Sequence, residues 1–130
     1  MKLDITSATN PKIKWVKSLH KNSARKKEVV FLVEGAKEVA MALDGGYEPH
    51  SFFICPEIAG KVADTDHEHM YTISKECFEK ISYRSSSDGL LAVFHVKQRS
   101  LADLNLSENP LIIIMEAVEK PGNLGAVIRT

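Results

Sequence analysis

The stretch Val29-Val-Phe-Leu-Val-Glu-Gly35 places five apolar residues directly before a glutamate and a glycine. A short apolar run rich in valine predicts a buried strand, and Gly35 predicts the turn that follows it. A helix pattern over residues 36–43 comes next and is closed by two glycines. Strand and helix patterns then alternate, with strands expected over 50–55, 71–73 and 90–96 and helices over 56–62 and 74–81. This alternation predicts an α/β fold, a three-layer α/β sandwich with a mostly parallel sheet.

A basic helix is expected before this core. The residues from Ser7 to Asn10 can cap it, Pro11 fits its first turn, and its pattern runs to about His20. Its inner face is expected to carry Ile13, Val16 and Leu19. Trp15 lies between two lysines, so it either caps the hydrophobic core or stacks on a base.

The formal net charge of zero hides an uneven distribution. Residues 1–30 hold eight Lys and Arg against two acids, which gives 8 − 2 = +6, and residues 31–130 hold nine against fifteen, which gives 9 − 15 = −6. A basic N-terminal segment is typical of a surface that contacts a polyanion such as RNA. A solvated helix face would have the same composition, and charge alone does not separate the two.

The composition is that of an ordinary globular domain, with 44% hydrophobic and 26% charged residues. No segment has the length and hydrophobicity of a membrane span, and the N-terminus lacks the apolar region of a signal peptide, so we expect a cytoplasmic protein with no membrane partner. Cys55 and Cys77 stand among apolar neighbours and are expected to be packed, reduced thiols. His67 and His69 lack a clear third ligand, so no metal site is expected.

The C-terminal residues predict a strand, a tight turn and a helix. Leu111-Ile-Ile-Ile-Met115 reads as a short buried strand, Pro121-Gly122 as the turn, and Asn123 as the N-cap of a helix that starts at Leu124. Strand, turn and helix form a common ligand-facing loop of α/β proteins. The polar segment before it, over residues 99–109, is expected to be a linker.

The residues Pro121, Gly122, Asn123, Gly125 and Arg129 resemble the first signature motif of the SpoU/TrmH family of RNA ribose 2′-O-methyltransferases, which belong to the knotted SPOUT class. Asn10-Pro-Lys-Ile-Lys14, the stretch from Phe31 to Gly35 and the strand that Gly89 opens resemble the substrate-recognition domain that often precedes that motif. The resemblance implies a ribosomal-protein-like RNA-binding domain over residues 1–98 and the start of an incomplete methyltransferase domain over 110–130.

The same resemblance implies the function. The parent protein would be an enzyme that methylates RNA, expected to be ribosomal RNA, with S-adenosyl-L-methionine as the methyl donor and a homodimer as its working form. The donor site would lie in later motifs, so this chain alone is expected to be inactive. The alternative is a stand-alone RNA-binding adaptor of ribosomal-protein-like type that has no catalysis.

Candidate site residues follow from both lines of reasoning. The resemblance makes Asn123 and Arg129 catalytic, with Arg129 activating the 2′-hydroxyl. A guanidinium is a poor base because it stays protonated, so Arg129 would orient phosphate or stabilise an alkoxide unless its site is unusual. The residues expected to contact RNA are the basic N-terminal set and one loop arginine: Lys12, Lys14, Lys17, Lys21, Arg25, Lys26, Lys27 and Arg84.

The loop around Arg84, over residues 83–89, combines hydroxyls with a guanidinium. This suits phosphate or ribose contacts, and it equally suits a plain turn rich in Ser, Asp and Gly. Glu34 and Gly35 are expected to fix a loop or pack rather than to catalyse, with Gly35 supplying an unusual backbone angle.

Overall fold

The computed structural model of the chain describes residues 4–60 and 68–130. Residues 64–67 of the predicted exposed acidic loop, His67 among them, therefore lie outside the described residues. The chain divides into two compact units, Met1–Gln98 and Arg99–Thr130.

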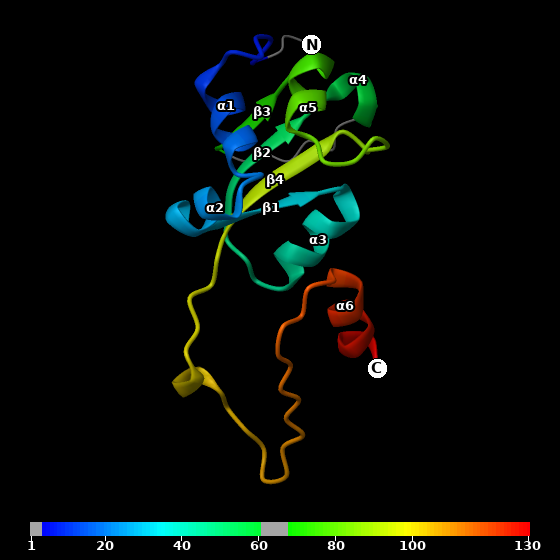
Figure 1. Ribbon diagram of the computed structural model, residues 1–130. Coiled ribbons are helices and arrows are strands. Elements are labelled where there is room, and N and C mark those ends of the chain that lie inside the picture. The colour runs from blue at the N-terminus through cyan, green and yellow to red at the C-terminus, as the bar shows by residue number, and fades with distance from the viewer. Residues whose placement is uncertain (1–3, 61–67) are drawn as a thin grey trace. The chain divides into compact units, whose positions relative to one another are not determined.

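The first unit contains five helices and four strands within the described residues (Figure 1). In chain order these are α1 (Pro11–Ser18), α2 (Asn22–Glu28), β1 (Val30–Glu34), α3 (Ala36–Asp44), β2 (Pro49–Ile54), α4 (Pro56–Ala59), β3 (Met70–Thr72), α5 (Lys75–Ile81) and β4 (Leu90–His95). The predicted strands and most of the predicted helices are confirmed to within one or two residues. Helix α4 is shorter than predicted, since it ends at Ala59 and Gly60 follows with a positive φ of 67°.

Helix α2 was not predicted, because Asn22 and Ser23 favour turns over helix interiors. No side chain caps its first turn, and it ends at Val29 in the left-handed conformation, with φ of 57°. Ala24 packs against the core, so tertiary contacts hold this short helix in place where local sequence preferences do not.

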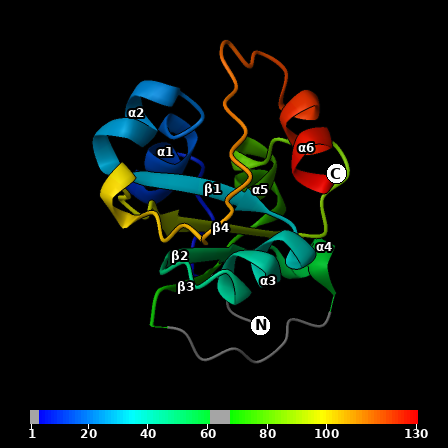
Figure 2. The same ribbon diagram turned by 90° about the horizontal axis from the view of Figure 1, so that it is seen from below.

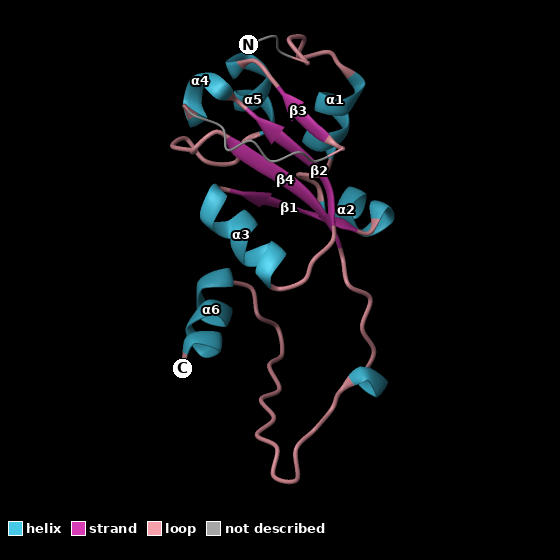
Figure 3. Cartoon of the chain, turned by 180° about the vertical axis from the view of Figure 1, so that it is seen from behind, coloured by secondary structure: helices cyan, strands magenta, loops and turns pink. Residues whose placement is uncertain are grey.

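The four strands form one sheet in the order β1-β4-β2-β3, with β1 and β3 at its edges (Figure 3). The prediction of a mostly parallel sheet is wrong in its pairings, because β4 runs antiparallel to both β1 and β2, and only β2 and β3 pair in parallel. The three strands joined by α3 and α4 do share one direction. Strand β4 is the exception, and its direction is set after the end of α5. There Ser82 and Tyr83 are hydrogen-bonded to Glu34 at the carboxyl end of β1. The chain therefore enters β4 from that end and runs back.

Helices cover both faces of the sheet, which confirms the three layers of the predicted sandwich. The larger core packs α1 and α5 against one face through residues such as Ile13, Phe53 and Phe78. The smaller core packs α3 against the other face, where Val39 meets Phe52, Ala92 and Phe94. Figures 1 and 2 show α3 separated from α1 and α5 by the sheet. Cys55 and Cys77 are free and buried in the larger core, as predicted.

Helix α1 begins and packs as its sequence predicts. Asn10 caps it by accepting a hydrogen bond at Oδ1 from the backbone N–H of Lys12 (2.9 Å), and Pro11 occupies its first turn. Ile13, Val16 and Leu19 are fully buried. Burial of three aliphatic side chains stabilises this docking by about 5 kcal/mol before the entropy cost of ordering. It also fixes which residues of α1 face the solvent.

The second unit contains a short 3₁₀ helix, Leu101–Asp103, and helix α6, Pro121–Arg129. The predicted strand at Leu111–Met115 is wrong: these residues form no regular structure, and even Met115 is 41% exposed. A strand needs a neighbour for its backbone hydrogen bonds, and no strand of the described residues pairs with this segment. The predicted helix does form, but it begins at Pro121 with Lys120 as N-cap, so Asn123 lies inside it.

Among the described residues, none of the helices has the length and apolar character needed to cross a membrane.

Candidate nucleic-acid interface

Six exposed lysines lie on α1, on α2 and at the turn between them, and together they are called the basic face here: Lys12, Lys14, Lys17, Lys21, Lys26 and Lys27. Burial of the apolar side of α1 leaves its lysines in solvent. Within residues 4–60 and 68–130 the recorded ion pairs are Lys75 with Glu79 and Arg84 with Glu38, so no lysine of the basic face is neutralised by an acid there. Six ammonium groups that lack a carboxylate partner can bind phosphates at little cost.

Arg25, which is predicted to contact RNA, makes hydrogen bonds within the protein. Its Nη1 donates hydrogen bonds to the carbonyl oxygens of Leu19 (2.7 Å) and His20 (2.9 Å). These carbonyls belong to the end of α1, where backbone acceptors lack helical partners. Arg25 therefore holds the turn between α1 and α2 in place. Its positive charge adds to that of the basic face, but its guanidinium is already hydrogen-bonded to the backbone, unlike the lysine ammonium groups.

His20 joins this turn to the loop that carries Arg84. Its ring stacks on Tyr83 with the centroids 3.8 Å apart and the planes 15° apart, and its Nε2 lies 2.8 Å from the carbonyl oxygen of Ile81, to which it must donate. Burial lowers the pKa of His20 below its ordinary 6.5, against the opposing effect of the Ile81 carbonyl, and Lys17 and Arg25 lower it further. A neutral imidazole thus holds the Tyr83 loop against the α1–α2 turn.

Buried Glu34 fixes the start of that loop, as its expected loop-fixing role required. Ser82 Oγ donates to its Oε1 (2.5 Å) and the Tyr83 backbone N–H donates to its Oε2 (2.7 Å). Gly35 follows with φ of 111°, which confirms the unusual backbone angle. The loop ends at Asp88, whose Oδ2 accepts a hydrogen bond from the Ala36 backbone N–H (2.6 Å) at the start of α3.

Replacing Glu34 with alanine is expected to lower the free energy of unfolding by about 2–3 kcal/mol, because two donors lose a charged acceptor in a buried position. Urea denaturation followed by circular dichroism measures the change. Glu38→Ala is the matched control, since it removes an exposed carboxylate and its 3.0 Å pair with Arg84 and should move the midpoint little. Equal losses in the two variants would contradict the loop-fixing role of Glu34.

Arg84 is exposed and its Nη2 lies 3.0 Å from Glu38 Oε1. The hydrogen bond from Arg84 lowers the pKa of Glu38, and the same bond raises the pKa of Arg84. To bind a phosphate, Arg84 would have to exchange this carboxylate for the RNA backbone. The position of Arg84 is thus compatible both with a plain turn and with an RNA contact.

The predicted catalytic residues Asn123 and Arg129 lie on α6 with exposed side chains. Six residues apart on a helix, they are rotated by about 120° from each other. The helix alone therefore does not direct both side chains to one point.

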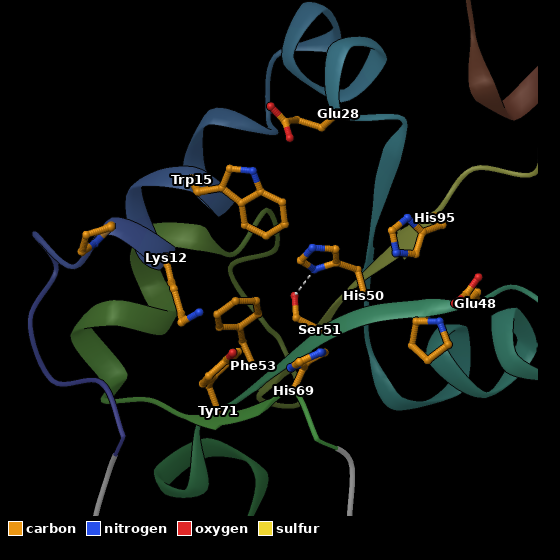
Figure 4. Close-up of a pocket in the computed structure, with 12 residues that line it drawn as sticks. Lys12, Trp15, Glu28, Glu48, His50, Ser51, Phe53, His69, Tyr71 and His95 are labelled. Carbon is orange, nitrogen blue, oxygen red and sulfur yellow. Dashed lines mark hydrogen bonds between the residues drawn. The ribbon is translucent and has the colours of Figure 1, made fainter.

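A cavity of about 620 Å³ opens beside the first turn of α1 and was not predicted from the sequence (Figure 4). It brings Trp15 together with histidines from β2, β4 and the residue before β3. The lining residues are Pro11, Lys12, Trp15, Glu28, Glu48, Pro49, His50, Ser51, Phe53, His69, Tyr71 and His95. No sequence motif joins these positions, because the register of three strands assembles them. Trp15 is half-buried at the edge of the larger core, so it both packs and lines the cavity.

Comparison with known proteins places residues 10–92 in the family described as MRM3-like substrate binding domain. The chain is 29% identical over 136 residues to the 23S rRNA (guanosine(2553)-2′-O)-methyltransferase RlmP of Bacillus subtilis, which covers 97% of this chain and 49% of that protein.

Two solved structures that resemble this chain are also RNA methyltransferases. An RNA 2′-O ribose methyltransferase matches with a TM-score of 0.75 and 32% identity, over 96% of this chain and 50% of the other. The AdoMet-bound rRNA methyltransferase of Sinorhizobium meliloti matches with a TM-score of 0.64 and 24% identity, over 79% and 40%, and supports the fold alone. The chain thus spans about half the length of the proteins it matches.

Proposed function

The chain belongs to the family of MRM3-like substrate-binding domains, and from this membership we propose that it is the RNA-recognition part of a SpoU/TrmH-type RNA 2′-O-ribose methyltransferase. The family match over residues 10–92 carries the proposal, because it covers the whole sheet except the end of β4. Ribosomal RNA is the proposed substrate class, since the Bacillus subtilis relative is named for that activity.

The basic face can supply the phosphate contacts that RNA recognition needs. Phosphate contacts give an RNA-binding protein affinity and orientation, while base contacts give it sequence preference. Lysines that lie on one helix and the adjoining turn can follow a strand of phosphates. We propose Lys12, Lys14, Lys17, Lys21, Lys26 and Lys27 as the phosphate contacts, with Arg25 as their structural brace and Arg84 as a further contact.

The methyl transfer itself is proposed for the longer protein. S-adenosyl-L-methionine would supply the methyl group, as the AdoMet-bound relative suggests. The ribose 2′-oxygen would form a bond to the methyl carbon as the bond from that carbon to the donor sulfur breaks and leaves a neutral thioether, and the hydroxyl proton would pass to water. A positive group near the oxygen would stabilise its developing charge. We assign this role to Arg129 and a polar supporting role to Asn123.

We propose that residues 99–109 serve as a linker and that residues 110–130 form the start of the catalytic domain. These 130 residues alone are not expected to transfer methyl groups. A homodimer is the proposed working form.

A salt titration tests the RNA proposal. If about five of the seven side chains proposed above meet phosphates in one complex, a plot of the logarithm of the association constant against the logarithm of the salt concentration should have a slope of roughly −3.5 to −4.5. Binding of a labelled 23S rRNA fragment, measured by fluorescence anisotropy at several potassium chloride concentrations, gives this slope. A flat response, or no binding at low salt, would contradict RNA recognition by this chain.

A further inference from the structure

The cavity beside α1 has the size and lining of a binding site. Its volume of about 620 Å³ lies within the roughly 300–1,000 Å³ of small-molecule sites. Two sets of rings line it (Figure 4). Trp15 and His50 have their ring centroids 4.9 Å apart, and Phe53 and Tyr71 have theirs 5.5 Å apart.

The histidine in this lining is held in position. His50 Nδ1 lies 3.1 Å from the hydroxyl of buried Ser51, and His95 adds a third ring 5.3 Å from His50. Burial, followed by the charges of His95, His69 and Lys12, lowers the pKa of His50 below its ordinary 6.5, against a smaller opposing effect of Glu28. At neutral pH the Trp15–His50 pair is therefore an uncharged aromatic surface, which suits stacking on a nucleobase.

Both basic and acidic side chains line the cavity. Lys12 Nζ lies 4.6 Å from the centre of the Tyr71 ring, which holds its ammonium group near the aromatic lining. Glu28 and Glu48 also line the cavity, and carboxylates accept hydrogen bonds from the amino groups of bases. The arrangement offers stacking rings, a phosphate-binding cation and acceptors in one hollow.

We propose that this cavity binds the base of one unpaired RNA nucleotide, which stacks on Trp15 and His50 while Lys12 contacts its phosphate. The inference rests on the RNA recognition proposed above and adds a base-binding subsite to it. Helix α1 supports the assignment, because it carries Lys12 and Trp15 at the cavity and Lys14 and Lys17 on the basic face. An unpaired nucleotide is required, since a base in a duplex has its faces covered by its neighbours.

Trp15 is the only tryptophan of the chain, so its fluorescence reports on the cavity alone. A 12-nucleotide single-stranded RNA is expected to quench it on binding, whereas inorganic polyphosphate, which has the charge but no bases, is expected to bind without quenching. Trp15→Leu should raise the dissociation constant for the single strand by roughly fivefold to hundredfold, the range measured for loss of one stacked base. Trp15→Phe should recover most of the affinity.

The outcomes separate the two proposals. If the wild-type chain binds the single strand with the expected salt slope, but Trp15 is not quenched and Trp15→Leu binds like wild type, the base subsite is wrong and RNA recognition stands. If the wild-type chain binds no RNA at low salt, the proposed function fails. The quenching measurement uses the unaltered chain, so the test does not depend on how well Trp15→Leu folds. Lys12→Gln, a change at an exposed residue, should weaken binding by about fivefold at 0.1 M salt and provides a second check.

Discussion

Replacing Lys14, Lys17 and Lys21 together with glutamine is expected to weaken RNA binding about a hundredfold at 0.1 M salt. Each phosphate contact on a single strand adds roughly 0.7 to the salt slope, which corresponds to about a fivefold gain in affinity at that concentration. The three side chains are exposed and follow one another along α1 and the turn after it. Their loss should therefore remove three contacts without altering the core.

A matched variant separates location from total charge. Lys37, Lys75 and Lys80 are also exposed, but they lie on α3 and α5 rather than on the basic face. Their joint replacement by glutamine changes the net charge by the same amount and should leave the affinity within a few-fold of wild type. Fluorescence anisotropy with one RNA at one salt concentration compares the two variants. Similar losses in both would mean that RNA senses only the net charge and that α1 and α2 form no specific face.

Replacing Gly89 with alanine is expected to lower the free energy of unfolding by about 2–5 kcal/mol. Gly89 precedes β4 with φ of 82°, and a Cβ placed there would lie 2.7 Å from the backbone nitrogen of Ala59 and 3.0 Å from the carbonyl oxygen of Cys55. Both contacts are with backbone atoms, one at the residue before α4 and one at the last residue of α4, and backbone atoms cannot yield as a side chain can. The Gly89 carbonyl also accepts a hydrogen bond from the Cys55 backbone N–H (2.8 Å).

Gly46 provides the control for this prediction. It has a similar φ of 68°, but the nearest atom to an added Cβ is the flexible end of Lys97, at 3.4 Å. Gly46→Ala should therefore cost only about 1–2 kcal/mol, the penalty of the left-handed conformation itself. Urea denaturation of both variants, with unchanged dependence on denaturant concentration, gives the difference. A loss at Gly89 no larger than the loss at Gly46 would show that backbone contact at α4 does not constrain the loop.

The sequence predicted the four described strands of the first unit and its helices other than α2, because each of these has a strong local pattern. Apolar residues three apart placed α1 with its lysines outward, and apolar runs placed β1 before Gly35 and β2 before Pro56. The direction of β4 could not be predicted in this way, since it depends on where α5 delivers the chain. That point is fixed by Glu34, which is 48 residues from Ser82.

The candidate site was predictable in its charges but not in its contacts. The lysines of α1 are exposed because their neighbours Ile13 and Val16 are buried, which the periodicity indicates. Arg25 belongs to the same basic run, yet its guanidinium caps α1, and only the fold of the α1–α2 turn reveals this. The aromatic cavity was missed because strand register, not sequence spacing, brings His50 and Tyr71 to Trp15.

We propose that this chain recognises RNA through α1, α2 and the adjoining cavity. The most direct test is the change in amide chemical shifts of the ¹⁵N-labelled 130-residue chain when a single-stranded RNA is added at low salt. We expect the largest changes on residues 12–27 and on His50 and Tyr71, with α3 unaffected. Changes confined to α3 and residues 99–130, or no changes at saturating RNA, would contradict this proposal.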